Sequence, residues 1–410
     1  MPAHDAAAEF TAHSPPAAPP RREIPALWPA LLAAPMAAGA NSPVLILPDI
    51  ARSFATTTLT AGWFVTAFAW ALAVGTPLMA GLLRRRGLRT TLRVSALLLA
   101  AGTVAVALAP WMALALPGRA AQAFGGAGLV ASAMSLARTV RRMGVIAMGF
   151  GVFAAVGPLL GSLIADTLSW RVSLMLSVPA LLALPAALRA APPAPPAPTT
   201  PFDARGAALL ATLASFLVLT PRYPLPAAIA AAAGGALLAL HVRARPDGFL
   251  PAALLRTPAF ALCALLACAL STSYFTLLFG LPGQLAARTD WSTAAIGAGQ
   301  LVALLAGSLC SWLLAATAGR MGGARVVALL IGLGLLARLT ADLTPWVPLL
   351  LPAFALSALA TTAGNATLAS YAAGVAPEAQ RPTAIGLFHL CYQLGGAFGP
   401  ALAALSTLPR

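Results

Sequence analysis

The chain has 410 residues, of which 60% are hydrophobic and only 9% are charged, and its mean hydropathy is +0.87. Because soluble domains carry about 25% charged residues, this composition excludes an ordinary soluble protein and indicates an all-α polytopic membrane protein. The net charge of +15 does not indicate a nucleic-acid partner, because the arginines lie in short loops between apolar runs. The expected partner is the lipid bilayer.

The predicted elements follow one another as apolar runs of membrane-spanning length. Residues 1–24 are polar and rich in Ala and Pro, and we expect a disordered cytoplasmic tail there. Thirteen runs then predict transmembrane helices near residues 26–47, 59–83, 92–110, 112–137, 143–165, 171–191, 206–221, 225–242, 258–282, 293–317, 325–341, 346–372 and 382–406.

These runs predict a division of the chain into two bundles with an insertion between them. We expect an N-terminal six-helix bundle at 25–191, a Pro-rich cytoplasmic linker at 192–204, an extra transmembrane helix pair at 205–243 and a C-terminal bundle of five helices at 244–410. The division is supported by a weak internal repeat, since Gly157-Pro158 recurs as Gly399-Pro400, 242 residues later. Two parallel bundles of like design would produce this pattern.

The arginines predict how the chain is oriented in the membrane. With a cytoplasmic N-terminus, eighteen arginines fall in cytoplasmic segments and six outside, while Arg119 lies within a span. Positive residues gather on the cytoplasmic side of membrane proteins. We therefore expect a multi-pass protein of the cell (plasma or inner) membrane with its N-terminus in the cytoplasm.

The span after residue 143 has the composition of a helix that packs closely against a neighbour. Gly157 and Gly161 leave part of its surface bare, and Pro158 removes a backbone donor in its middle. Such a helix suits a line of contact between two bundles that move past each other. A tightly packed structural helix is the alternative, since Gly and Pro are ordinary in membrane helices.

The run LPDIARSF…GWFVTAFAWALAVGTPLMAGLLRRRGLR looks like the start of the major facilitator superfamily, in particular of its fourteen-span drug:proton antiporters. Arg119, Gln122 and Gly125-Gly126 resemble its fourth-helix motif, and Gly157-Pro158-Leu-Leu-Gly161 resembles its antiporter motif in the fifth helix. Phe202-Asp203-Ala-Arg205-Gly206 resembles the beginning of its extra helix pair. The similarity covers nearly all of residues 25–407.

The resemblance implies a two-bundle secondary active transporter that exports an amphipathic drug-like compound or metabolite by alternating access, with protons as the exchanged ion. We expect a monomer. The residues it implies for coupling and conformational change are Arg119, Gln122, Gly157, Pro158 and Gly161, to which we add His389. The residues of its cytoplasmic loop motif are Arg84, Arg85, Gly87 and Arg89.

The chain also departs from the family pattern. Arg84 stands where the loop motif normally carries an Asp, which leaves a cationic patch that could meet anionic lipid. Gly39 and Val44 stand where the first helix usually carries an Asp and an Asn. The pattern also expects one more span after 382–406, so either the gene product is truncated or thirteen spans suffice.

Proton coupling needs a group that can change its charge inside the membrane. None of the ten acidic residues is predicted at mid-membrane, and His389 is the intramembrane side chain whose charge changes most readily near neutral pH. A hydrogen bond between helices is the alternative role for His389. Arg119 is predicted to be buried beside Gln122, with snorkelling to the surface as its alternative.

Aromatic and amide side chains could line a central cavity for an amphipathic solute, or could face lipid and anchor the protein at the interface. The candidates are Trp63, Phe68, Trp70, Tyr274, Phe275, Gln284, Asn365, Tyr392 and Gln393.

Enzyme motifs are absent from the sequence: it has no nucleophile elbow, no HExxH, no phosphate-binding GxxxxGK[ST] and no paired membrane carboxylates. We therefore expect no enzyme, no cofactor and no metal. Two other readings stay open. One is a uniporter or importer of a small metabolite, and the other is a transport-dead membrane sensor or partner-binding protein.

Overall fold

The computed structural model describes residues 24–137, 140–192, 202–246, 248–318, 321–377 and 380–406. Within these ranges helices are the only regular secondary structure, which confirms the predicted all-α class. Residues 1–23 of the predicted tail and residues 193–201 of the predicted linker lie outside the described residues.

The first half of the described chain forms nine α-helices and two 3-10 turns. They are α1 (Leu27–Ala33), α2 (Pro35–Asn41), η1 (Ser42–Val44), α3 (Leu47–Ser53), α4 (Thr58–Ala61), α5 (Trp63–Leu108), α6 (Met112–Leu136), α7 (Val140–Thr167), α8 (Trp170–Ser173), η2 (Val178–Ala183) and α9 (Leu184–Ala190).

The second half forms the remaining helices of the described chain. They are α10 (Ala204–Leu219), α11 (Pro224–Ala244), α12 (Ala252–Leu255), α13 (Pro258–Arg288), α14 (Thr293–Ala318), α15 (Gly323–Leu343), η3 (Val347–Leu349), α16 (Leu350–Gly374) and α17 (Arg381–Ser406).

Each predicted span coincides with a helix or a broken series of helices. Among the described segments, seven are long and apolar enough to cross a membrane, or eight if the pair Leu27–Val44 and Leu47–Ser53, bent by 68°, is one span. One of the seven, Thr58–Leu108, holds two predicted spans. The total of thirteen crossings therefore stays a prediction.

The long helix α5 is divided at Gly87. This residue has φ 78° and ψ 176°, a conformation that is open to glycine and closed to residues with a Cβ. The chain turns there, and the Thr91 hydroxyl donates to the Gly87 carbonyl at 3.0 Å as the second half begins. We call the end of the molecule that carries this turn and its arginines the arginine end, and the end that carries α3 and α4 the opposite end.

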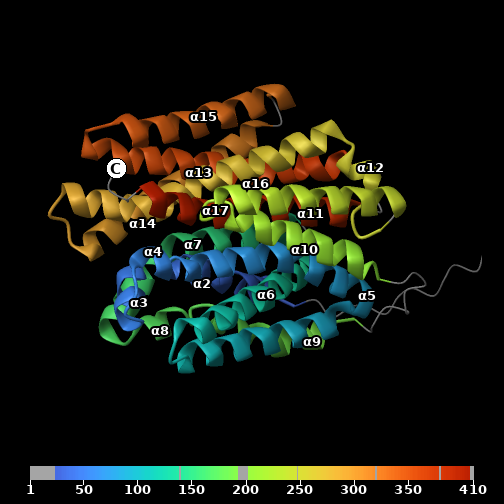
Figure 1. Ribbon diagram of the computed structural model, residues 1–410, viewed down its shortest axis with the longest axis horizontal. Coiled ribbons are helices and arrows are strands. Elements are labelled where there is room, and N and C mark those ends of the chain that lie inside the picture. Colours follow the sequence, from blue (N-terminus) through green and yellow to red (C-terminus); the bar gives the residue numbers. More distant parts are fainter. Residues whose placement is uncertain are drawn as a thin grey trace, which may run out of the picture.

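The helices gather into two bundles that follow the order of the chain. Figure 1 shows the helices of the first half in one layer and α13–α17 in the other. The bundles meet along two helix pairs, α5 with α17 and α7 with α14. Apolar cores cross both lines of contact: Val74 packs in one cluster with Leu387, and Leu45 in another with Ile296. We call the line between α5 and α17 the seam.

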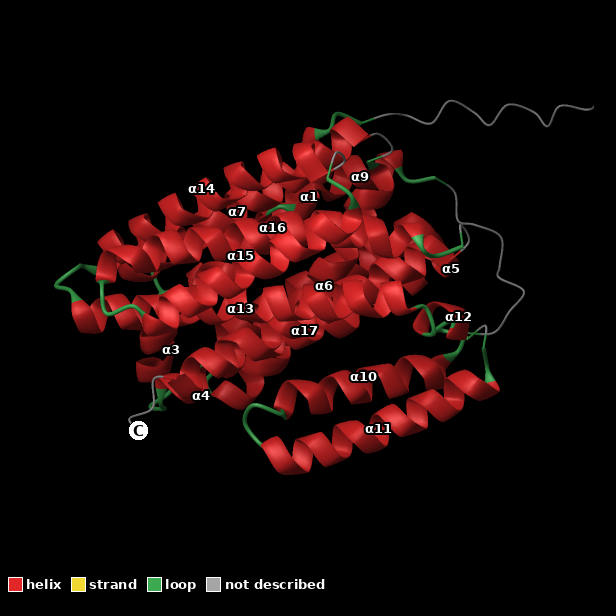
Figure 2. Ribbon diagram, turned by 90° about the horizontal axis from the view of Figure 1, so that it is seen from above, coloured by secondary structure: helices red, strands yellow, loops and turns green. Residues whose placement is uncertain are grey.

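The helices α10 and α11 form an antiparallel pair along one side of the molecule (Figure 2). Helix α10 contacts both α5 and α17, so the pair lies against the seam. Toward the C-terminal end of α10, the Trp70 indole N–H donates to the Ser215 hydroxyl at 2.9 Å. This hydrogen bond attaches the pair to the first bundle.

Candidate functional site

The fully buried side chain of Arg119 on α6 lies at the centre of a polar cluster in the first bundle. Its Nη1 donates to Gln122 Oε1 at 2.9 Å, and its Nη2 donates to the carbonyl of Gly39 on α2. The Phe68 ring on α5 lies over the guanidinium, with 4.2 Å between Cζ and the ring centroid. Gln122 Nε2 in turn donates to Thr103 Oγ1 at 3.0 Å. We call these five residues the Arg119 cluster.

The cluster contains no carboxylate. Among the described acids, Asp49 pairs with Arg52, Asp203 with His241 and Asp342 with Arg338. The described side chains of Asp166 and Asp290 are exposed. Within the described chain Arg119 is therefore a buried cation whose hydrogen-bond acceptors are all neutral. The predicted burial beside Gln122 agrees with this geometry, while the role of the pair in coupling stays a prediction.

The second bundle presents aromatic and titratable side chains around α17. His389 is half-buried, and its ring lies 5.5 Å from the Phe388 ring, edge to face. In the described part of the chain it has no hydrogen-bond partner. Tyr274 on α13 stacks on Phe354 at 5.8 Å and meets Phe275 edge to face at 5.0 Å. The predicted alternative for His389, a hydrogen bond between helices, is thus not present among the described residues.

In each bundle, the glycine of the repeated Gly-Pro pair packs closely against a neighbouring helix of the same bundle. A Cβ at Gly157 would lie 3.1 Å from Ala38 Cα on α2, and a Cβ at Gly161 would lie 2.9 Å from Ser42 Cα. A Cβ at Gly399 would lie 2.7 Å from the Thr276 backbone nitrogen on α13. The glycines of α7 therefore face the first helix of their own bundle. The contact with α14 is made elsewhere on α7, where Leu159 meets Gly297.

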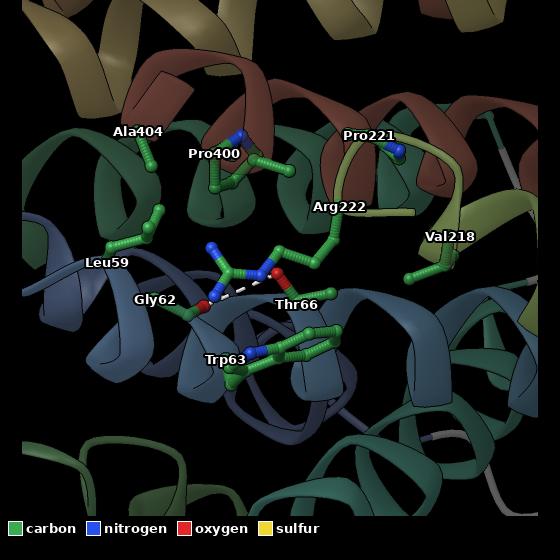
Figure 3. A pocket seen from close by; sticks show the side chains of 10 residues that line it. Leu59, Gly62, Trp63, Thr66, Val218, Pro221, Arg222, Pro400 and Ala404 are labelled. Carbon is green, nitrogen blue, oxygen red and sulfur yellow. Dashed lines mark hydrogen bonds between the residues drawn. The ribbon is translucent and has the colours of Figure 1, made fainter. Parts of the chain in front are cut away.

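An open cleft of about 450 Å³ lies on the seam at the opposite end. Figure 3 shows Arg222, from the turn between α10 and α11, lying across it near Gly62 and Thr66. Trp63 on α5 and Pro400 on α17 form facing walls. A second cleft of about 500 Å³ lies on the seam at the arginine end and is lined by Pro77, Ala80, Leu83, Arg84, Phe249, Thr383, Gly386 and Leu387.

The residues predicted to line one central cavity are not gathered by either cleft. Trp63 lies in the cleft of Figure 3, Phe68 covers Arg119, and Trp70 bonds to the helix pair. Tyr274 is buried, and Tyr392, Gln393 and Phe275 are half-buried. The side-chain oxygens of Gln284 and Asn365 are buried without a described partner. Their role in binding stays a prediction.

The arginines of the predicted loop motif have separate contacts at the arginine end. Arg89 Nε donates to the Ala191 carbonyl at 3.2 Å, which fixes the turn against the end of the first bundle. Arg85 Cζ lies 5.3 Å from the Phe202 ring, and Arg84 lines the nearby cleft.

Sequence reasoning missed a junction at this end that is centred on Asp203. Its carboxylate accepts from the Gly206 N–H and the Phe249 N–H, each at 2.9 Å, and lies 2.8 Å from His241 Nε2. Burial raises the pKa of Asp203, but the hydrogen bonds from Phe249, Gly206 and His241 outweigh it and hold the pKa below its ordinary value. We call these four residues the Asp203 junction.

The Asp203 junction places Phe249 on the seam. The Phe202 and Phe249 rings meet edge to face at 5.9 Å, and Phe249 lies 3.7 Å from where a Cβ of Gly81 would stand on α5. An Asp directly before a helix is a readable N-cap signal. The pairing with His241 has no such signal, because it joins two different helices.

Comparison with known sequences gives a family and two partial relatives. A model of the Major Facilitator Superfamily matches residues 27–400. The "Uncharacterized MFS-type transporter YvkA" of Bacillus subtilis (strain 168) is 28% identical over 184 residues, which are 42% of this chain and 41% of that protein. "Protein SGE1" of Saccharomyces cerevisiae (strain ATCC 204508 / S288c) is 28% identical over 125 residues, 29% of this chain and 23% of that protein. The alignment thus spans less than half the length of either relative.

Two solved structures have the same fold. The human organic anion transporter MFSD10 (TETRAN) gives a TM-score of 0.63 at 18% identity and covers 93% of this chain and 94% of its own. The POT family transporter PepTSo gives a TM-score of 0.59 at 16% identity and covers 95% and 91%. At these identities the likeness concerns the fold alone. Together with the family match over nearly the whole chain, it shows that this protein belongs to the Major Facilitator Superfamily, whose members are membrane transporters and not enzymes.

Proposed function

We propose that this protein exports a small amphipathic compound by alternating access and takes up protons in exchange. The observation that carries the proposal is the seam, where α5 and α17 meet between two bundles and where one cleft lies at each end. Helices that separate at one end while they stay in contact at the other would expose the interior to one side at a time. The proposed setting is the cell membrane, with the N-terminus and the arginine end in the cytoplasm.

His389 is the proposed carrier of the proton. Its ring lies on α17, the seam helix of the second bundle, and has no hydrogen-bond partner among the described residues. A histidine without a fixed partner can gain and lose a proton without breaking a structural hydrogen bond. Movement of α17 would change the exposure of the ring to either side.

A uniporter or importer is the second candidate, and one observation favours it. In the part of the chain that the structure describes, acidic side chains occupy helix ends and turns, so the interior offers no carboxylate to bind protons. In this case His389 would have no coupling role, and a proton gradient would not drive transport.

Flux in proteoliposomes with a pH-sensitive dye inside separates these functions. A panel of lipophilic dyes and antibiotics is added with and without a proton gradient, to wild type, to His389→Ala and to Cys391→Ala as a control on the same helix. Proton antiport predicts solute-dependent proton flux that is lost in His389→Ala but kept in Cys391→Ala, while solute-for-solute exchange survives in both. Gradient-independent flux would favour the uniporter. The capture of a partner without any flux would favour a sensor and contradict the proposal.

A further inference from the structure

We infer that the solute carries a negative charge, and that Arg119 pairs with this charge during part of the transport cycle. The inference rests on the proposed transport function and names its substrate class. It starts from the charge of the Arg119 cluster, which is positive and uncompensated among the described residues.

The guanidinium of Arg119 lacks the partner that a buried cation requires. Guanidinium groups stay protonated and carry five N–H donors. The described acceptors are the Gly39 carbonyl and Gln122 Oε1, and Arg119 Nε has none. Buried charges in membrane proteins normally pair with an opposite charge, because the desolvation cost is large. An anion brought by the solute would supply this partner.

A second unpartnered donor lies beside the same backbone position. The Ser177 hydroxyl is buried and has no described hydrogen-bond partner. The three atoms nearest to a Cβ built on Gly39 all belong to Ser177, with its Cβ at 3.1 Å. The Ser177 hydroxyl therefore lies beside Gly39, whose carbonyl accepts from the Nη2 of Arg119. A carboxylate or sulfonate has enough acceptor oxygens to satisfy both donors.

Access to Arg119 depends on the seam helix. The Phe68 ring that covers the guanidinium belongs to α5, the same helix that contacts α17. Rotation of the Phe68 side chain during opening would uncover the guanidinium. The cation–π contact with the uncharged Phe68 ring would then be replaced by a charge-assisted hydrogen bond to the solute, which is stronger.

The sign of the charge on the solute has two measurable consequences. Even before it pairs with Arg119, a solute charge about 12 Å away at an effective dielectric constant of about 20 is attracted or repelled according to its sign, which predicts a preference of about 100-fold for an anion over a matched cation. Export of one anion for entry of one proton also moves two positive charges inward. Such exchange is electrogenic, whereas exchange of a monovalent cation for a proton is electroneutral.

The test uses the full chain and two xanthene dyes of similar shape, the anion fluorescein and the cation rhodamine 123. Binding is followed by fluorescence polarisation in detergent, and flux in proteoliposomes with and without a membrane potential. Arg119→Gln removes the charge and Arg119→Lys keeps it. Arg171→Gln is the matched control, because Arg171 also donates to a backbone carbonyl, that of Ala109 at 2.9 Å, but is half-exposed.

We expect wild type to bind fluorescein about 100-fold more tightly than rhodamine 123, and its efflux to respond to the membrane potential. Arg119→Gln should lose at least ten-fold in affinity for fluorescein, whereas Arg119→Lys and Arg171→Gln should lose little. Should Arg119→Gln fail to fold, Gly39→Asp combined with Ser177→Ala supplies a carboxylate from the chain itself and should weaken fluorescein binding in the same way.

Three results would overturn the inference, and they differ in what they leave standing. Binding and flux of rhodamine 123 without fluorescein would show that the protein transports a cation, so the proposed transport would stand and the inference would fall. An equal loss of affinity for fluorescein in Arg119→Gln and Arg171→Gln would show that affinity depends on the net positive charge of the protein and not on a contact with Arg119. The absence of flux for solutes of either sign would remove the proposed function itself, and the inference with it.

Discussion

The Asp203 junction gives a prediction whose size can be worked from its contacts. Replacement of Asp203 by Ala removes the N-cap of α10, which is worth about 1 kcal/mol. It also leaves the Phe249 N–H without its acceptor, at about 1–3 kcal/mol for a buried donor. The loss of local stability is therefore about 2–4 kcal/mol, confined to the start of α10 and the segment around Phe249.

Hydrogen exchange of the backbone amides, followed by mass spectrometry in detergent, measures this loss where it occurs. At 1.4 kcal/mol per ten-fold, the amides of Gly206 and Phe249 should exchange at least ten-fold faster in Asp203→Ala. Asp290→Ala, which removes an exposed acid, should leave both amides unchanged. An unchanged Phe249 amide in Asp203→Ala would refute the assignment of Asp203 as the group that holds this segment.

The same junction has a definite pH dependence. Because the pKa of Asp203 is held below its ordinary value of about 3.9, its ionised form stabilises the folded protein. This contribution is complete above pH 3.9 and is lost as the pH falls through the lower folded value. The stability difference between wild type and Asp203→Asn should thus shrink as the pH falls below 4.

Three further experiments test the packing around the site, each by thermal unfolding of the purified protein. Gly87→Ala should destabilise by about 1–3 kcal/mol because of its positive φ, and an unchanged midpoint would contradict the turn. Gly161→Ala should destabilise by about 1–3 kcal/mol because its Cβ would meet Ser42, whereas Gly151→Ala on the same helix, with open space around it, should not. A double-mutant cycle of Trp70→Phe and Ser215→Ala should give a coupling of about 0.6 kcal/mol, and no coupling would argue against their hydrogen bond.

The positions of the helices could be predicted from the sequence because hydropathy and charge are local properties. The loop at Gly87 is readable in the same way, since arginines and glycine interrupt an apolar run. The broken first span is less readable. Pro43 and Pro48 lie near the break, but the 68° bend depends on packing, including the hydrogen bond from Asn41 Nδ2 to the Ala154 carbonyl at 3.0 Å.

The contacts of the candidate site were harder to predict, for a physical reason. Arg119 and Gln122 share one helix face at a spacing of three residues, so their meeting could be expected. The other acceptor of Arg119 is the backbone carbonyl of Gly39, and a carbonyl has no signature in a sequence. Trp70 and Ser215 lie 145 residues apart, and their hydrogen bond depends on how the helix pair docks.

The central claim is that the two ends of the seam open alternately, and thiol accessibility tests it most directly. Single cysteines at Thr383, in the cleft of the arginine end, and at Ala401, in the cleft of the opposite end, are placed in a chain whose four native cysteines are replaced by Ala. Their labelling rates with a membrane-impermeant maleimide are compared before and after a proton gradient and a transported solute are applied. Alternating access predicts that one rate rises while the other falls. Rates that rise together, or that both stay constant while solute still crosses the membrane, would contradict it.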